Sequence, residues 1–363
     1  RYRREAPIEA RTATLGYRTR KFMRRNAVGM GVAGAFLALI ALAGALLVQQ
    51  RNRAQREAQT AEQVTEYLAQ LFEANQLSTS QGDSLSVRSL LDRGQRRIED
   101  LSDQPAVQAR LLRVMGQVRT SLGEYRQAER LHRRALDRHQ SLHSGPHAQT
   151  AKTLSGLGNV LEERGEYRAS ISRLRRALNM HRASPESDPQ MEATMMGELS
   201  ESLRREGALD SAEAVQRSAL TLSQREPEAD SLDVATALMK LGIVLRHQGN
   251  LDRAEALHRQ ALQLRRSRLP PDRLDRITSL QNRASVLSQR GKYEQAETLY
   301  RRVIATYREN GVEKHPGVAQ SLSALGVTLR KQGYFGRAEE AYRQALSIER
   351  SHVEAPHPDL ALY

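Results

Sequence analysis

Apolar residues fall at helical spacing in paired segments, and the pairs recur every 42 residues. Leu238, Leu241 and Leu245 share one helix face ahead of Gly249, and a second apolar stripe occupies residues 254–262. Spacings of three and four residues are typical of an amphipathic α-helix. The pattern therefore predicts two helices in each 42-residue unit.

A glycine separates the two helices of every unit, and small residues stand seven positions before it and twelve after it. Glycine accepts a left-handed backbone because it has no Cβ, so it can end the first helix. A hairpin of two such helices cannot bury its own apolar face, and neighbouring hairpins must stack. The sequence thus predicts an all-α stack of six hairpins over residues 109–352. The six glycines are Gly123, Gly165, Gly207, Gly249, Gly291 and Gly333.

These units resemble the tetratricopeptide repeat over about residues 110–352. The 42-residue period differs from the common 34 and is similar to the kinesin light chain subtype. The opening of that subtype is matched at 315–319, which read His-Pro-Gly-Val-Ala, and more loosely at 357–361. The resemblance implies a right-handed superhelix.

Two copies depart from the pattern. In the second copy, Ser170 replaces a packing alanine and Arg173 replaces a leucine. In the third copy, Ser200 and Leu209 stand where glycine and tyrosine usually occur.

Residues 27–48 form a second strong signal, because all 22 of them are uncharged. At ~1.5 Å per residue, a helix of this length would span a ~30 Å hydrocarbon layer, whereas the alternative is a buried helix of a soluble protein. Basic residues are in excess on the amino-terminal side, which predicts a single-pass protein of the cytoplasmic (inner) membrane with its repeats outside the cytoplasm. The predicted contacts are then the lipid bilayer and, through the small residues Ala27, Gly31 and Ala35, a second copy of the same helix.

The remaining segments flank these two features. Residues 1–26 are basic and are predicted to be a cytoplasmic juxtamembrane segment. Residues 49–108 are predicted to be a helical bridge, with helices over 61–77 and 87–101, that ends in a degenerate capping repeat. Residues 353–363 are predicted to start a truncated seventh repeat.

The order of these parts resembles the carboxy-terminal half of bacterial transmembrane serine/threonine protein kinases with tetratricopeptide repeats. The Tyr-Arg-x-x-Lys-Phe stretch of that family is matched by Tyr17, Arg18, Lys21 and Phe22. The resemblance implies a kinase domain ahead of Arg1, to which ATP and magnesium would belong. No kinase motif occurs in these 363 residues, so no catalytic residue and no cofactor is assigned to them.

The tetratricopeptide resemblance also implies a binding groove lined by the first helix of each hairpin. Positions 13, 10, 6 and 3 before each glycine point into such a groove, which suits an extended peptide or a protein segment. The alternative is an ordinary solvated face. The candidates are Arg110, Arg113, Gln117, Thr120, Lys152, Ser155, Asn159, Glu162, Glu201, Arg204, Met239, Ile243, Arg246, Gln281, Ser285, Ser288, Ser323, Val327 and Arg330.

Charge and histidines add little to this interpretation. The net charge of +14 comes with glutamates placed to pair along the helices and without interleaved aromatic residues, which argues against nucleic acid. His139, His143 and His147 are spaced by four residues, but no cysteine or carboxylate completes a zinc ligand set, and we expect them at the surface. The absence of cysteine excludes disulfides and thiolate chemistry.

The sequence therefore favours a membrane-anchored sensing or docking region of a serine/threonine kinase. The alternative is a membrane-tethered repeat scaffold, without a kinase, that serves complex assembly or secretion. No motif supports a soluble enzyme.

Overall fold

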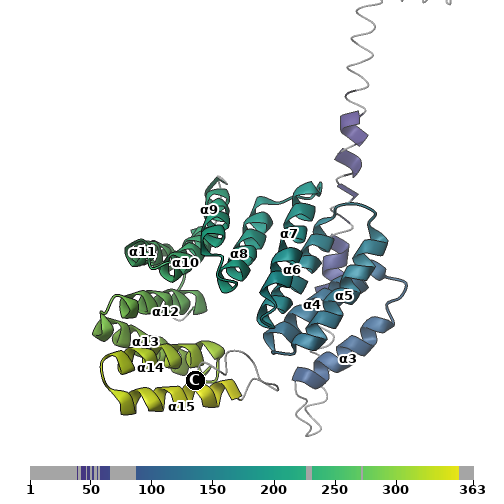
Figure 1. Cartoon of the computed structure of the whole chain (residues 1–363). Helices are drawn as coiled ribbons and strands as arrows, with labels where there is room; N and C mark the ends of the chain where they lie inside the picture. The colour runs from purple at the N-terminus through teal and green to yellow at the C-terminus, as the bar shows by residue number, and fades with distance from the viewer. Residues whose placement is uncertain are drawn as a thin grey trace, which may run out of the picture. The chain divides into compact units, whose positions relative to one another are not determined.

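The computed structural model describes residues 87–225, 231–270 and 273–350, together with scattered helical residues between 39 and 65. Contacts divide the chain into two units, Arg1–Gln70 and Leu71–Tyr363. The second unit holds the repeats, and every element assigned in its described part is an α-helix (Figure 1).

Six antiparallel helix pairs follow one another along the second unit, in the order that the 42-residue pattern predicts. Each pair joins a first helix to a second helix across one of the predicted glycines. The pairs are α4 (Pro105–Ser121) with α5 (Tyr125–Leu142), α6 (Ala148–Glu163) with α7 (Tyr167–Ala183), α8 (Pro189–Arg205) with α9 (Leu209–Arg225), α10 (Ser231–His247) with α11 (Leu251–Arg268), α12 (Leu274–Gln289) with α13 (Tyr293–Glu309), and α14 (Pro316–Lys331) with α15 (Phe335–Arg350).

All six predicted glycines adopt positive φ angles, between 76° and 89°. This backbone lets the chain leave the first helix and bond back to it: in the fourth hairpin, the N–H of Asn250 donates to the carbonyl of Leu245 at 2.9 Å. The glycines therefore act as the predicted helix ends.

Where the residue seven positions before the helix-ending glycine is itself a glycine, it makes room for one large side chain of the second helix. A Cβ added to Gly158 would lie 2.7 Å from Cγ of Leu174, and one added to Gly326 would lie 2.8 Å from Cε1 of Tyr342. Contacts this short cannot be accommodated without movement, so the glycine sets the distance between the two helices.

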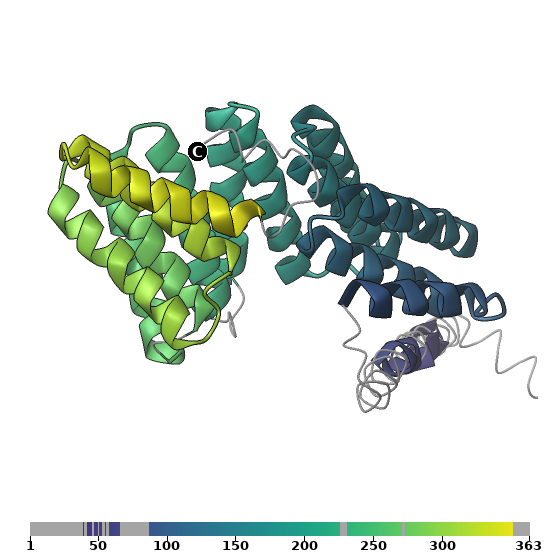
Figure 2. The ribbon, with the colours of Figure 1, turned by 90° about the horizontal axis from the view of Figure 1, so that it is seen from below.

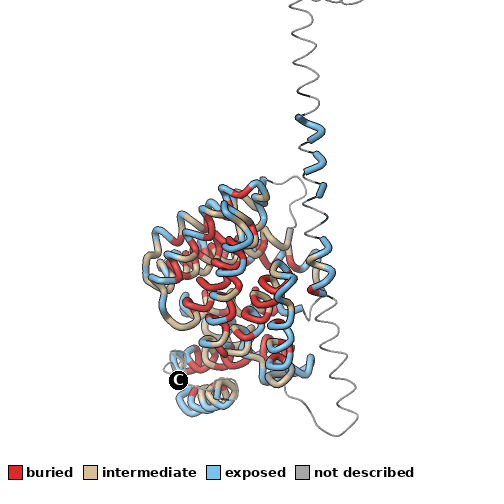
Figure 3. Tube along the Cα trace, turned by 90° about the vertical axis from the view of Figure 1, so that its right-hand side faces the viewer, coloured by how far each residue is buried: buried red, intermediate tan, exposed pale blue. Residues whose placement is uncertain are grey.

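Each hairpin packs on the next one, and the core lies between them. Buried positions follow the interior of the stack, whereas exposed positions follow its outer surfaces (Figure 3). Seen from below, the helices follow one another across the stack in chain order, from blue to yellow (Figure 2). The arrangement is that of stacked hairpins, as predicted.

A polar contact between successive hairpins recurs at a spacing of 35 residues. A glutamate six positions after one glycine accepts a hydrogen bond from the residue just before the next glycine. The pairs are Glu129 with Arg164, Glu213 with Gln248 at 2.9 Å, Glu255 with Arg290, and Glu297 with Gln332 at 3.1 Å. The junction of the second and third hairpins lacks this contact, because its glutamate position holds Ile171.

The shorter helix α3 (Val87–Glu99) packs against the first hairpin. Its residue Asp92 accepts a 2.6 Å hydrogen bond from Arg119, which is buried where the other first helices carry leucine. Gln108 donates to the carbonyl of Ile98 at 2.9 Å. Thus α3 occupies the place predicted for a helix over 87–101, and it supplies polar partners to the first hairpin.

The predicted single-pass location in the inner membrane is corrected here. Within the residues that the structure describes, no helix combines the length and the apolar character needed to cross a bilayer. Most of residues 27–48 lie outside the described residues, as do 1–26, 66–77 and 353–363. The bilayer contact and the transmembrane homodimer depended on the same prediction, and they are not retained.

Candidate functional site

The first helices α4, α6, α8, α10, α12 and α14 form one continuous surface, which we call the first-helix face. Each first helix from α4 to α12 contacts the next first helix along the chain, whereas the second helices make no comparable contacts with one another within α3–α15. A stack whose first helices approach more closely than its second helices curves toward the first helices. The first-helix face therefore lies on the inner side of the stack.

The predicted groove residues differ in how far they reach solvent. Ser155 and Glu162 are buried between hairpins, which makes them structural as well as polar. Exposed candidates are Gln117, Val327 and Arg330. Half-buried candidates are Arg110, Arg113, Thr120, Lys152, Asn159, Glu201, Arg204, Met239, Ile243, Arg246, Gln281, Ser285, Ser288 and Ser323.

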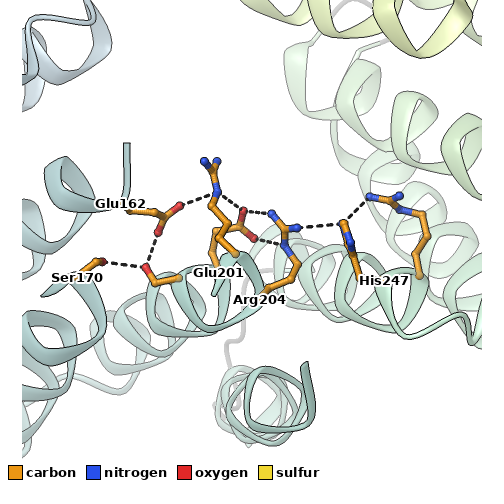
Figure 4. Close-up of polar contacts among 8 residues, drawn as sticks. Glu162, Ser170, Glu201, Arg204 and His247 are labelled. Carbon is orange, nitrogen blue, oxygen red and sulfur yellow. Dashed lines mark hydrogen bonds and ion pairs between the residues drawn. The ribbon is translucent and has the colours of Figure 1, made fainter. Parts of the chain in front are cut away.

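A chain of hydrogen bonds and ion pairs crosses the centre of this face (Figure 4). Glu201 accepts from Nε of Arg204 at 2.9 Å and from Nε of Arg205 at 3.1 Å. Arg204 then reaches Nε2 of His247, 2.9 Å away on the next first helix. The structure thus brings Glu201 and Arg204 together and links the third hairpin to the fourth.

Burial and neighbouring charges determine the protonation states of Glu201 and His247. Burial alone would raise the pKa of Glu201, but the hydrogen bonds and charges of Arg204 and Arg205 outweigh burial and lower the pKa to about 2. Burial and the charges of Arg246 and Arg204 lower the pKa of His247 to about 4. At neutral pH Glu201 is therefore a carboxylate, and His247 is a neutral acceptor.

At its other end, this series of hydrogen bonds and ion pairs reaches the junction of the second and third hairpins. Arg205 lies 3.2 Å from Glu162, whose second oxygen accepts a 2.6 Å hydrogen bond from Ser202. Ser202 in turn lies 2.9 Å from the hydroxyl of Ser170. Burial raises the pKa of Glu162 to about 7, even though Ser202 and Arg205 favour the carboxylate. The serine of the irregular second copy thus belongs to a buried polar cluster, at the junction that lacks the 35-residue contact.

Glu198 accepts hydrogen bonds from two further candidate groove residues, both on the preceding hairpin. Its carboxylate accepts a 2.9 Å hydrogen bond from Nδ2 of Asn159 and a hydrogen bond from Ser155. These bonds join α6 to α8 across the first-helix face. Ser155 and Asn159 are therefore partly occupied in holding hairpins together.

Several other candidates bond within or between hairpins. Thr120 donates to the carbonyl of Gly116 at 2.8 Å, and Ser285 lies 2.8 Å from the hydroxyl of Tyr300. The hydroxyl of Ser288 lies 2.9 Å from that of Thr328 on the next first helix. These polar groups support the packing, so the candidates best placed to meet a ligand are the exposed ones and the arginines.

Sequence reasoning missed Glu198, Ser202, Arg205 and His247. Glu198 and His247 lie nine and two positions before their glycines, immediately beside positions ten and three of the predicted set. Neighbouring positions on a helix lie 100° apart, so a face wider than one stripe includes both registers. A wider window on the helical projection could have found them.

The histidines of the first junction stack on one another. The rings of His143 and His147 are 3.5 Å apart and those of His139 and His143 are 6.3 Å apart. His139 is buried, so the prediction of a surface position is wrong for this residue. His147 accepts a hydrogen bond from the N–H of Gln149 and caps α6, as His315 does for α14. In the part of the chain that the structure describes, no cluster of three or more His, Asp or Glu side chains could hold a metal ion.

Comparisons with known proteins give the following matches. A tetratricopeptide repeat family model matches residues 107–183, 191–267 and 271–351. No curated protein sequence matches.

Among solved structures, a Rap protein complexed with Competence and Sporulation Factor is similar, at 13% identity and a TM-score of 0.54, over 81% of this chain and 98% of that chain. The Rap conjugation gene regulator of plasmid pLS20, in complex with the Phr* peptide, shares 16% identity at a TM-score of 0.52, over 69% and 76%. A putative kinesin light chain from P. anserina shares 15% identity over 58% and 99%, at a TM-score of 0.44. At these identities the two Rap structures establish a common fold, and the kinesin light chain carries no argument about subtype.

Proposed function

This chain belongs to the tetratricopeptide repeat family, and we propose that its first-helix face binds an extended peptide or a protein segment. The observation that carries the proposal is the hydrogen-bonded series Glu201–Arg204–His247, which presents fixed polar groups on the inner side of a curved stack. Solenoid proteins commonly bind through their concave side. Support comes from the Phr* peptide in one Rap structure and from Competence and Sporulation Factor in the other, because both structures share this fold.

The chemistry of the face suits a peptide rather than a small apolar ligand. Half-buried arginines can pair with carboxylates or backbone carbonyls, and Met239, Ile243 and Val327 offer isolated apolar contacts. Such a combination resembles the peptide-recognition surfaces that read backbone polar groups and a few side chains. We assign the face a docking role and no catalysis.

Site-specific photocrosslinking tests this proposal. Peptides of twelve residues would first be selected by mRNA display on the immobilised chain. Benzoylphenylalanine would then replace Gln117, Gln281 or Val327 on first helices, and Arg175 or Gln260 on second helices as controls. We expect selected peptides to crosslink to the first-helix positions only. Selection of no peptide, or crosslinking mainly at 175 and 260, would refute the proposal.

A finer proposal is that this docking region serves a serine/threonine protein kinase. Its support is the sequence match of Tyr17, Arg18, Lys21 and Phe22, which stands ahead of the repeats. Mass spectrometry of the native polypeptide, captured with an antibody against the repeats, would test it. Peptides carrying kinase motifs on the same polypeptide are expected, and a native chain without them would exclude the kinase.

A further inference from the structure

A small pocket lies between α8, α9 and α10, where one position of the first-helix pattern has no side chain. Position ten before the glycine holds Gly197 in α8, whereas the other five first helices carry side chains there. Lys240 of α10 reaches into the gap: a Cβ added to Gly197 would lie 2.8 Å from Nζ of Lys240. The pocket has a volume of about 80 Å³, and its walls include Thr194, Gln216 and Thr236.

Two polar groups in this pocket have no partner among the described residues. No hydrogen bond or ion pair involves Nζ of Lys240 in the described part of the chain. Gln216 is 1% exposed; its Nε2 donates to the carbonyl of Ala237 at 3.1 Å, but its Oε1 accepts from no described group. A buried acceptor without a donor is costly, so this oxygen favours a ligand that can donate to it.

The other polar groups of the lining are already engaged. Thr194 and Thr236 donate to the carbonyls one turn earlier in their own helices, at 2.9 Å. Asp233 accepts a 2.6 Å hydrogen bond from Gln190 across the pocket. Among the described lining residues, the pocket therefore offers the cationic donor Lys240 and one buried acceptor that has no donor, Oε1 of Gln216.

We propose that this pocket binds the carboxamide of an asparagine or glutamine side chain in the docked peptide. The carboxamide oxygen accepts from Lys240, and its NH₂ group donates to Oε1 of Gln216. A carboxylate would place an acceptor against Oε1 and a negative charge near Asp233, and an ammonium group would meet the charge of Lys240. The volume is that of about three waters, at ~30 Å³ each, which matches the head of an amide side chain.

This inference rests on the proposed peptide docking and assigns it a sequence preference. The mRNA-display selection separates the two. It would be run in parallel on the wild-type chain, on Gly197→Ala, on Lys240→Met, and on Gly336→Ala as a matched control. A Cβ at Gly336 meets nothing within 4 Å. Alanine is a better helix former than glycine, so both glycine variants should stay folded, and circular dichroism would check this.

We expect wild type and Gly336→Ala to enrich peptides with Asn or Gln at one fixed position, and Gly197→Ala and Lys240→Met to lose that preference. In fluorescence anisotropy, changing this amide to Asp or Ala should weaken binding to wild type about tenfold, and binding to Gly197→Ala less than twofold. Enriched peptides without a fixed amide, or an amide preference unchanged in Gly197→Ala and Lys240→Met, would overturn the inference while leaving peptide docking intact. Absence of any enriched peptide would overturn both.

Discussion

His258 of α11 lies against Gly242 of α10, so close that a Cβ on Gly242 would come within 2.8 Å of Cε1 of the imidazole. The ring is fully buried, and neither nitrogen has a hydrogen-bond partner among the described residues. His132 is placed in the same way against Gly116 in the first hairpin. Two hairpins are thus packed around a neutral imidazole where others use Leu174 or Tyr342.

These histidines should make the repeats less stable in acid. Burial, and then the charge of a nearby arginine, lower the pKa of His132 and of His258 to about 4. The unfolded chain takes up these protons near pH 6.5, so stability is complete above that pH and is lost as pH falls toward 4. We expect the free energy of unfolding at pH 5 to fall by about 2 kcal/mol for each histidine. The variant His258→Leu should remove the part of this loss that His258 causes. Urea denaturation at pH 5 and pH 7.5 measures this, and an equal pH dependence in wild type and variant would contradict it.

Glu162 should make the repeats less stable at high pH, whereas the histidines make them less stable at low pH. Because burial raises its pKa to about 7, the folded chain holds this proton more tightly than the unfolded chain, and the stabilisation present at low pH is lost as pH rises through 7. Glu162→Gln keeps an acceptor for Ser202 and removes the buried charge. We expect it to raise the free energy of unfolding by about 2 kcal/mol at pH 8 and by little at pH 5. The exposed Glu309→Gln is the control, and a gain independent of pH would exclude this role.

The 35-residue contacts should contribute measurable coupling. Glu255 and Arg290 form one of them, and the side chains are 9% and 28% exposed. A double-mutant cycle with Glu255→Gln and Arg290→Gln should give a coupling free energy of about 1 kcal/mol, because both groups are partly shielded from water. The exposed pair Glu339 and Arg343 should give less than about 0.5 kcal/mol. Similar coupling in the two pairs would argue against a special role for the contact between hairpins.

Glycine-to-alanine changes should have opposite effects at two positions. Gly249 has φ 82°, where a Cβ costs about 1–2 kcal/mol. Gly336 lies within α15 with open space around it, and alanine there should stabilise by about 0.5–1 kcal/mol. Thermal denaturation should show a lower melting temperature than wild type for Gly249→Ala and a higher one for Gly336→Ala. Equal shifts would mean that the turn does not require the left-handed backbone.

The last hairpin has a small side chain beside an open groove, and a larger side chain there should stabilise the hairpin. Ala341 occupies the position that holds leucine in the first, fourth and fifth hairpins, and a pocket of about 550 Å³ lies beside it over Ile304, Leu322 and Leu325. Ala341→Leu should raise the free energy of unfolding by about 1 kcal/mol by filling this space. Ser347→Leu, on the exposed face of the same helix, is the control, and a comparable gain there would refute the packing explanation.

The repeat pattern predicted most of the fold because its signals are local. A glycine at a fixed position ends one helix, and the apolar stripes on either side define the two helices that it joins. For this reason Gly249 and its counterparts located every hairpin. The pattern also marked a small residue seven positions before each glycine, and Gly158 against Leu174 shows which side chain uses the space that a small residue leaves.

Contacts between hairpins could not be predicted in the same way. Glu198 holds Asn159 because of the rotation between successive hairpins, which no spacing within one repeat encodes. Ser170 looked like a simple defect in the sequence. Its partners Ser202 and Glu162 lie on two different helices, so the cluster became visible only once those helices were placed. The buried state of His139 was hidden for the same reason.

The junction of the second and third hairpins has the buried Glu162 in place of the 35-residue contact. The junctions should therefore respond differently to salt and to pH. Joints closed by Glu129 and Arg164, or by Glu255 and Arg290, are held by opposite charges and soften as salt screens them. The junction of the second and third hairpins also contains an ion pair, between Arg205 and Glu162, but burial raises the pKa of Glu162 to about 7, so this junction becomes less stable as Glu162 ionises at alkaline pH. High salt and high pH should therefore weaken different junctions between hairpins of the same stack.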